Sequence, residues 1–369
     1  MLLDYHREVA AGGIGLTTVA YAAVCKNGLS FPHQLWLRKE LIPELRKLTN
    51  TIHKEGATAS IQLGHCGNMS KKSITGTLPV SPSGGFNIYS PTWSKKMDMD
   101  DIKKVVQDFA NSALIARESG FDAVEIHAGH GYLISQFLSP YTNKRKDEFG
   151  GSFENRIRFM LMVIRAVLQA VGKDMAVIVK INMRDGFKGG MEIRESLKLA
   201  GILEKEGVHA LILSGGFVSK APMYVMRGKM PVKTLTHYMN NRWLKISVRL
   251  AGKMVIPDVP FKEIYFLEDA LKFRKEIKIP LIYVGGIISG KSISKVLDSG
   301  FEFVAMARAL INDPGFVNKL KIDISSKNNC DISNYCIARM YSKEMACHHN
   351  IESLPDKIQK EINKNKCFE

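Results

Sequence analysis

The chain lacks any long apolar run. No stretch approaches the ~20 residues that a helix needs to cross a bilayer, and the opening, MLLDYHREVAAGG, lacks the basic and then apolar layout of a signal peptide. Cysteine is scarce as well, with 6 in 369 residues, and the first two lie far from the others. Secreted, disulfide-bonded proteins have a different pattern. These absences together predict a cytoplasmic protein with reduced thiols and no contact with a membrane.

Two sequence features that would indicate nucleic-acid or dinucleotide binding are also missing. The formal charge of +16 suggests nucleic-acid binding, but no basic cluster is interleaved with aromatic residues. Basic residues are mixed with acids, as in Lys39-Glu40 and Lys54-Glu55, so we expect a solvated basic surface and no nucleic-acid partner. Such a surface would attract anionic small-molecule substrates or the phosphates of a nicotinamide cofactor. No G-x-G-x-x-G follows a strand, which argues against a separate dinucleotide-binding domain.

The hydrophobic pattern that is present predicts a large α/β domain. Hydrophobic residues make up 45% of the chain and charged residues 24%, enough to bury a sizeable core. Apolar, β-rich runs alternate with longer amphipathic runs, which is typical of parallel βα units. The expected helices are 42–55, 99–119, 153–171, 193–206, 261–275, 290–299 and 308–319. The expected strands, one short of a (β/α)8 TIM barrel, are 14–19, 57–63, 121–126, 176–181, 210–214, 281–284 and 303–306.

Polar side chains gather after the third of these strands. The apolar run 121–126 ends in a loop that carries His127, His130 and Tyr132. Each side chain can donate a hydrogen bond near neutral pH, and Tyr132 can also give up a proton, which suits a substrate that gains negative charge on oxygen. Two other interpretations stay open: the residues are structural, or the histidine pair begins a metal site, although no third ligand follows at a recognised spacing.

The whole stretch from Val124 to Arg158 resembles the Old Yellow Enzyme family of flavin reductases, in particular the branch of 2,4-dienoyl-CoA reductase and trimethylamine dehydrogenase. The resemblance implies a TIM barrel that binds FMN and takes hydride from NAD(P)H. It rests on His-x-x-His-x-Tyr, QFLSP, the Asn143/Arg145 turn, the loop 148–152 and the helix start Glu154-Asn155-Arg156.

The resemblance also implies that one segment is missing. Relatives carry about one strand and loop before the region that matches residues 3–7, and this first barrel strand is absent here. A barrel without it has two unpaired strand edges and an opened core. We expect either a misplaced start codon or a shortened chain that does not hold its cofactor.

Family roles can be carried to individual positions. His127 and His130 would hold a carbonyl oxygen of the substrate, and Tyr132 would protonate the carbon next to it. Gln62 would face the pyrimidine edge of the flavin. Lys180, where relatives have arginine, would stabilise negative charge on the reduced ring. Without the resemblance, Gln62 is a strand-end cap, and Lys180 could form a Schiff base as in aldolase-type barrels.

The last two strands predict a phosphate site. Gly285 and Gly286 close one strand, and Ala307 and Arg308 open the last helix. In barrels, these two loops and a nearby helix N-terminus commonly hold a phosphate through backbone N–H groups. With the resemblance, the phosphate of FMN is the expected ligand.

Two long segments suit binding surfaces. The loop 67–91 is rich in Gly, Ser and Pro and is expected to cover the cofactor or substrate, with Trp93 as a lid residue or as packing. The segment 214–260 is rich in Met, Tyr and Arg, which suits a substrate or subunit contact or a satellite core. Tyr21 departs from the small residue or Glu of relatives and could narrow the cofactor's edge.

The C-terminal residues predict a separate tail. We expect a barrel domain at 1–325 and a tail at 326–369 that carries Cys330, Cys336 and Cys347. Longer relatives bind a [4Fe–4S] cluster here through four cysteines, but Ser333 stands at the place of the second. The three cysteines with an imidazole could hold zinc instead, or remain without metal.

These observations favour an FMN-dependent, NAD(P)H-oxidising ene-reductase that acts on an alkene conjugated to a carbonyl. Two alternatives are a Schiff-base, aldolase-like barrel that uses Lys180, and a shortened flavin-fold protein without activity. The sequence does not distinguish NADH from NADPH, identify the natural substrate or fix the oligomeric state, a homo-oligomer included.

Overall fold

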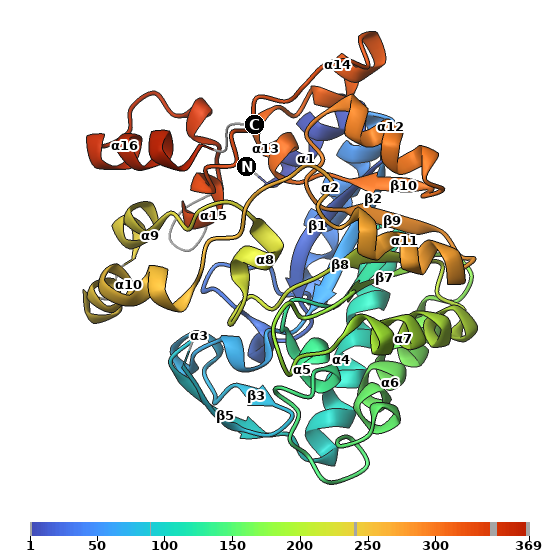
Figure 1. Ribbon diagram of the computed structural model, residues 1–369. Coiled ribbons are helices and arrows are strands. Elements are labelled where there is room, and N and C mark those ends of the chain that lie inside the picture. Colours follow the sequence, from blue (N-terminus) through green and yellow to red (C-terminus); the bar gives the residue numbers. More distant parts are fainter. Residues whose placement is uncertain (1, 89, 240–241, 340–344, 367–369) are drawn as a thin grey trace.

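A single parallel sheet organises the molecule in the computed structural model, which describes residues 2–88, 90–239, 242–339 and 345–366 (Figure 1). All neighbouring strands in it run parallel, with successive strands side by side. Its order is β1 (Leu16–Ala23), β2 (Thr58–Gly64), β6 (Ala123–Ala128), β7 (Ala176–Asn182), β8 (Ala210–Ser214), β9 (Leu281–Val284) and β10 (Phe303–Ala305).

All seven predicted strands are confirmed, and the sheet is an open barrel. Within the described residues, β1 and β10 form the two ends of the strand order and do not pair with each other. The register places Leu16 of β1 and Phe303 of β10 on the inward face, because side chains that are paired across parallel strands share one face. Leu16 is 41% exposed and Phe303 is 55% exposed. The inner face is therefore open at these edges, as expected for a barrel that lacks one strand.

Helices cover the outer face of the sheet. The outward side chains of the strands, such as Val124, Val177 and Leu211, are fully buried in the main core against these helices. Helix α4 has a strong start, because Asp98 and Asp101 each accept a backbone N–H of the other. The covering helices are α1 (Leu2–Ala11), α2 (Ile42–Lys54), α4 (Met99–Glu118), α6 (Phe153–Val171), α7 (Ile193–Glu206), α11 (Leu267–Glu276) and α12 (Gly290–Asp298), with single turns η1 (Lys26–Gly28) and η2 (Lys39–Leu41) between β1 and α2.

Two predicted helices need correction. The helix expected at 261–275 begins only at Leu267, because Ile264 has φ 49°, a left-handed conformation that a right-handed helix cannot include. The helix expected at 308–319 is two helices, α13 (Arg308–Asn312) and α14 (Phe316–Ile322). Pro314 lies between them and lacks the N–H that a continuous helix would use.

Helix α1 packs against helices from the C-terminal part of the chain. Val9 is buried with Leu310 and Phe316 in a second apolar cluster. At the end of α1, the backbone N–H of Asn318 donates to the carbonyl of Gly12 at 3.0 Å. A Cβ on Gly12 would lie 2.0 Å from the carbonyl oxygen of Pro314, so the two segments touch through backbone. The N- and C-terminal parts of the barrel are thus joined by α1 and α14.

Gly12→Ala is expected to destabilise the protein by about 1–3 kcal/mol, because the added methyl group has no room and the backbone of residue 314 must move. Gly15→Ala is the matched control, since a Cβ on Gly15 meets nothing within 4 Å. Chemical denaturation of both variants measures the difference. Equal free energies of unfolding for the two variants would contradict the close contact.

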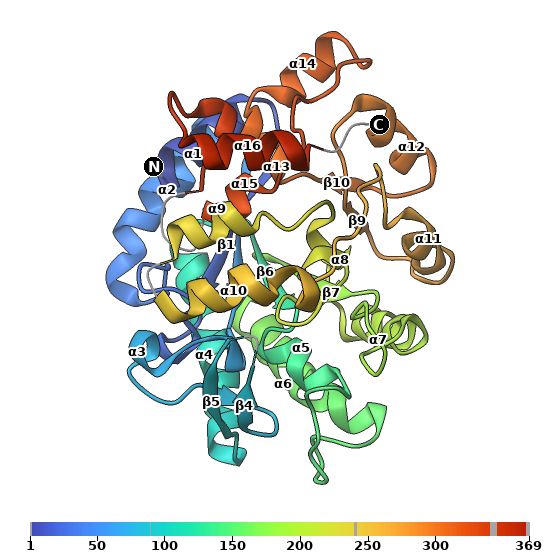
Figure 2. The same cartoon turned by 60° about the vertical axis from the view of Figure 1, so that its left-hand side comes forward.

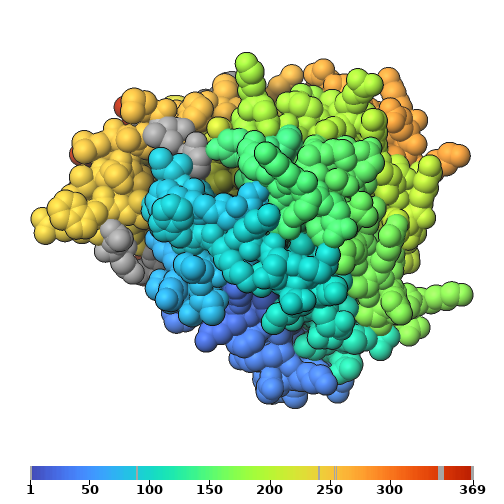
Figure 3. Space-filling view, turned by 90° about the horizontal axis from the view of Figure 1, so that it is seen from below, coloured from blue at the N-terminus to red at the C-terminus, as the bar shows by residue number. Residues whose placement is uncertain are grey.

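The predicted long loop 67–91 is more ordered than expected. It contains η3 (Gly67–Met69), α3 (Lys72–Thr75), β3 (Val80–Ser81) and β4 (Gly85–Asn87), and these strands join β5 (Thr92–Lys96) in a small sheet of order β3-β5-β4. Arg145 fixes this sheet to the barrel by donating to the carbonyls of Pro82 and Met97, each at 2.7 Å. Trp93 is 65% exposed and contacts Phe86, so it does not pack in a core. The small sheet lies on the face shown in Figure 3.

The segment after β8 forms a satellite unit, one of the two predicted alternatives. Its helices are α8 (Pro222–Met226), α9 (Val232–Tyr238) and α10 (Arg242–Val255), and Met223, Met230 and Val232 form a small core. Helix α10 projects from the molecule with Trp243, Leu250 and Met254 exposed, in gold at the left of Figure 3.

The C-terminal tail packs on this satellite unit. It contains α15 (Tyr335–Arg339), η4 (His348–Asn350) and α16 (Asp356–Asn365), and α15 and α16 lie beside α9 in Figures 1 and 2. The carboxylate of Glu361 accepts the backbone N–H groups of Lys233 and Thr234, at the start of α9. No helix among the described residues has the length and apolar character needed to span a membrane.

Candidate active site

The loop after β6 brings three predicted residues to one place. His127 is the second-last residue of β6, and Tyr132 directly precedes α5 (Leu133–Leu138). Between them the chain turns sharply, with φ 59° at His130 and φ 79° at Gly131. Glycine is required at 131, because a Cβ there would lie 2.5 Å from the ring of Phe217. This turn directs His130 and Tyr132 back toward His127.

The three rings are in contact. The ring centroids of His127 and Tyr132 are 4.7 Å apart, and those of His127 and His130 are 5.1 Å apart. The ring of Tyr21 joins the group at 5.2 Å from that of Tyr132. Tyr21 is positioned by its hydroxyl, which bonds the Ser30 hydroxyl at 2.7 Å. The expected influence of Tyr21 on the site therefore acts through an aromatic face beside Tyr132.

Both histidines are neutral imidazoles. Burial lowers the pKa of His130 to about 3, with the nearby Lys180 cation adding to the shift. Burial likewise puts the pKa of His127 well below its usual value, with help from His130 and Lys180. His130 Nε2 lies 2.7 Å from the Ser214 hydroxyl, whereas the buried Nδ1 of His127 has no hydrogen-bond partner. An unsatisfied buried nitrogen is costly unless a ligand uses it.

A buried carboxylate links the two predicted flavin contacts. Glu125 lies two residues before His127 on β6, and its Oε1 is 2.6 Å from the Nζ of Lys180. The same oxygen accepts a hydrogen bond from Nε2 of Gln62. The strand register places Gln62 beside Glu125 on β2 and β6. Glu125 was not predicted from the sequence, and it fixes both Gln62 and Lys180 on the inward face.

The predicted phosphate-binding glycines pack against a neighbouring segment. A Cβ on Gly285 would lie 2.9 Å from the ring of Phe266, and one on Gly286 would lie 2.9 Å from the ring of Tyr265. The two glycines have φ values of 138° and 73°, which other residues rarely adopt. Their glycine character is thus explained by this close packing, and phosphate binding at the turn stays a prediction.

Arg227 is a cation near these glycines, since its guanidinium lies over the ring of Tyr265, and the sequence alone assigned it no individual role. Its guanidinium lies over the rings of Tyr265 and Tyr224, at 4.5 Å and 4.7 Å. The buried Nε atom has no hydrogen-bond partner. The unusual φ of 55° at Arg227 is the only local signal, and a sequence does not reveal it.

Arg308 points toward the tail. Ala307 is the N-cap of α13, and Nη1 of Arg308 donates to Oδ1 of Asn334 at 2.7 Å. Arg308 also lines a cavity of about 20 Å³ together with the three predicted metal ligands, Cys330, Cys336 and Cys347. The structure therefore places Arg308 beside the cysteines, and its predicted contact with a phosphate stays a prediction.

The cysteine cavity does not fit an iron–sulfur cluster. Its volume suits about one water molecule, and Ser333 takes the place of a fourth thiolate. Burial raises the pKa of the Cys336 thiol to about 12 and also raises that of Cys330, which disfavours the thiolate form that metals bind. Cys367 lies outside the described residues. Zinc binding by these cysteines stays a prediction.

Comparison with known proteins identifies the family. Residues 1–251 match the model of the NADH:flavin oxidoreductase / NADH oxidase family. The chain belongs to this family. The resemblance to the Old Yellow Enzyme family is thereby confirmed, and this is a family of flavin- and NAD(P)H-dependent oxidoreductases.

Individual family members are similar over different shares of their length. The 4,4'-dithiodibutanoate disulfide reductase of Rhodococcus erythropolis is 38% identical over 342 residues, 92% of this chain and 85% of that protein. The NADH oxidase of Thermoanaerobacter brockii is 31% identical over 324 residues, 87% of this chain. The match covers only 45% of that longer protein, so this chain spans less than half of it.

Solved structures show the same fold. A 2-naphthoyl-CoA reductase complex superposes with a TM-score of 0.78 at 22% identity over 98% of this chain and 52% of that one. Morphinone reductase has a TM-score of 0.68 at 21% identity, covering 95% of this chain and 90% of that one. The predicted TIM-barrel class is therefore confirmed, in its open, seven-stranded form.

The site fits the ring end of the family's flavin. Gln62 on β2 presents a hydrogen-bonding group and Lys180 on β7 a cationic group, and the unsatisfied Nδ1 of His127 lies on β6, the strand between them. A planar ring with polar edges needs groups of this kind.

Proposed function

We propose that this family member uses FMN to pass hydride from NAD(P)H to an alkene conjugated to a carbonyl. The observation that carries the proposal is the contact of His127, His130 and Tyr132 beside the Gln62, Glu125 and Lys180 network. These side chains come from the carboxyl ends of β2, β6 and β7, where barrel enzymes place their chemistry.

Bound FMN would supply the hydride exchange between NAD(P)H and substrate. Gln62 would bond the polar edge of the ring, and Lys180 would stabilise negative charge there as a point charge. Glu125 would keep both groups oriented, since one of its carboxylate oxygens contacts Nζ of Lys180 and Nε2 of Gln62. An amine held against a carboxylate suits charge stabilisation better than the Schiff-base alternative, in which the nitrogen must attack a carbonyl.

The neutral histidines suit a carbonyl that gains electron density. A neutral imidazole donates through one nitrogen, and the free Nδ1 of His127 is available to the substrate oxygen. His130 is held by Ser214 and stays beside it. Tyr132, whose ring lies against His127, would deliver a proton to the substrate carbon. The residues would thus bind, polarise and protonate the substrate.

A disulfide is the second candidate substrate. This candidate is favoured because the chain is 38% identical to a disulfide reductase, and the match covers 85% of that protein. In that case Tyr132 would protonate the leaving thiolate instead of a carbon. The two candidates use one site and differ in the bond that is reduced.

Purified full-length protein is expected to carry flavin and to oxidise NAD(P)H faster when 2-cyclohexenone is added. The same assay with 4,4'-dithiodibutanoate tests the second candidate. Absorbance of the flavin and of NAD(P)H measures both steps without oxygen. Acceleration by the disulfide alone would replace the alkene proposal, and flavin-loaded protein that responds to neither substrate would reject both.

A further inference from the structure

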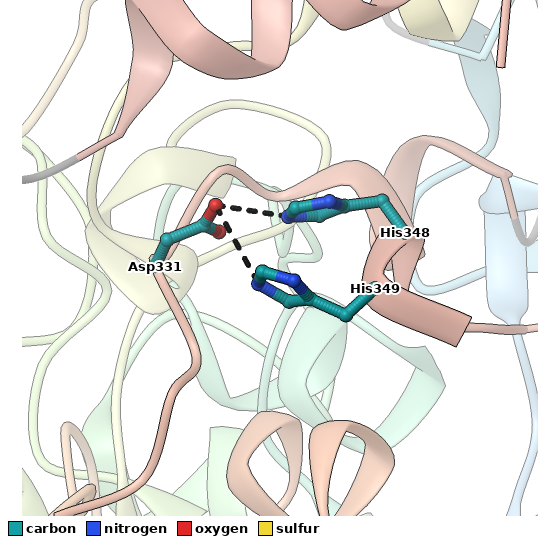
Figure 4. A group of neighbouring side chains, drawn as sticks. All are labelled: Asp331, His348 and His349. Carbon is teal, nitrogen blue, oxygen red and sulfur yellow. Dashed lines mark hydrogen bonds and ion pairs between the residues drawn. The ribbon is translucent and has the colours of Figure 1, made fainter. Parts of the chain in front are cut away.

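A group of metal-ligating side chains lies in the tail, outside the candidate active site. Asp331, His348 and His349 are shown in Figure 4. Their ligand atoms all lie within 4.8 Å of one another, and within the described residues no other set of three His, Cys, Asp or Glu side chains comes as close. The neighbouring cysteines, which the sequence suggested as ligands, are not part of this set.

The two imidazoles converge on one carboxylate oxygen. Nε2 of His348 lies 2.9 Å from Oδ2 of Asp331, and Nε2 of His349 lies 4.0 Å from the same atom. The two rings are nearly stacked, with centroids 4.0 Å apart and planes at 34°. The contact of His349 is too long for a hydrogen bond. A salt bridge alone therefore does not explain the position of His349.

The surrounding groups hold the ligands in place. The other carboxylate oxygen of Asp331 accepts the backbone N–H of Ser333 at 3.1 Å, which leaves Oδ2 to face the histidines. Partners of this kind orient metal ligands in proteins. The side chain of His348 is buried, while that of His349 is 41% exposed and so borders solvent, from which water could complete a metal shell.

The donor atoms suit a dication. One carboxylate oxygen and two imidazole nitrogens are ligand types that zinc takes in proteins, and here they come from three side chains whose ligand atoms all lie within 4.8 Å of one another.

We propose that Asp331, His348 and His349 bind one divalent transition-metal ion of the zinc class, with water completing the shell. Nitrogen and oxygen ligands of this number match a tetrahedral zinc site with one open position. The ion would tie the η4 turn to the loop at residue 331, 17 residues earlier in the chain. The ion would hold these two parts of the tail together and would take no part in the flavin chemistry.

Equilibrium dialysis of the chelator-treated full chain against Zn²⁺ tests the proposal. One zinc per chain is expected, and His349→Ala should weaken binding by at least about 10-fold. His349 is the most exposed of the three, so this variant should fold. His33→Ala removes an exposed histidine elsewhere and is the matched control. Unchanged zinc affinity in His349→Ala, or no zinc bound at all, would overturn the site.

Co²⁺ in place of Zn²⁺ separates this site from the cysteines. A nitrogen and oxygen shell should give weak visible bands without a thiolate-to-cobalt charge-transfer band in the near ultraviolet. A strong band of that kind, lost in Cys347→Ser, would show that the metal sits in the cysteine cavity and would refute the proposed ligand set.

Discussion

Tyr132→Phe is expected to slow enone reduction by about 10²- to 10⁴-fold, the usual contribution of a positioned proton donor. The reduction of bound flavin by NAD(P)H should proceed at the normal rate, because no proton from Tyr132 is used in that half. The aromatic ring stays in its contact with His127, so the fold of the site is preserved. Rapid-mixing measurements of the two half-reactions show which one has changed.

Tyr21→Phe is the matched control for this experiment. Its ring also lies in the group, 5.2 Å from that of Tyr132, but its hydroxyl bonds Ser30 and the carbonyl of Gly28. This variant should lose about 1 kcal/mol of stability and keep its turnover. A Tyr132→Phe protein that reduces the enone as fast as the Tyr21→Phe protein would rule out proton donation by Tyr132.

Stability is expected to fall steeply as the pH drops from about 6.5 toward 5. Burial lowers the pKa values of His6 to about 4 and of His65 and His130 to about 3, and that of His127 well below 6.5. In this window the unfolded chain binds protons on these histidines and the folded chain does not. Each of these histidines then lowers the free energy of unfolding by about 1.4 kcal/mol for every pH unit of acidification. The stability is fully present above pH 6.5 and lost on acidification.

Urea unfolding at several pH values measures this slope. His130→Asn should make the slope shallower by about 1.4 kcal/mol per pH unit, whatever it does to stability at pH 7. Carboxylates titrate mainly below pH 5, so they contribute little in this window. A wild-type slope near zero would mean that the histidines are accessible to protons in the folded state.

The strands and the loop after β6 could be predicted because their signals are local. Each strand is a short apolar run between turn residues, and His127, His130 and Tyr132 follow one such run directly. Glu125 was missed because it lies inside the apolar run, where one carboxylate adds no pattern. Its role depends on the register that sets it beside Gln62, and a register is a property of two strands.

Arg308 and the tail show the limit of such reasoning. A basic residue after the last strand predicts a phosphate contact, which stays a prediction, but the hydrogen bond of Arg308 to Asn334 in the tail could not be predicted from the sequence. The Asp331, His348 and His349 group was equally invisible. Asp331 lies 17 residues before His348, which is no recognised ligand spacing, and the chain fold alone brings the three side chains together.

The junction of α1 with α14 determines when the barrel can be completed during synthesis. Asn318 donates its side-chain amide to the carbonyl of Ala11 at 2.9 Å, across 307 residues. On the ribosome, the first helix emerges long before this partner exists, and contacts between such distant residues form slowly. Helix α1 therefore lacks this partner until the nascent chain has been made as far as residue 318. We expect the folding of the chain in cells to depend on chaperones more than that of a fold built from near neighbours.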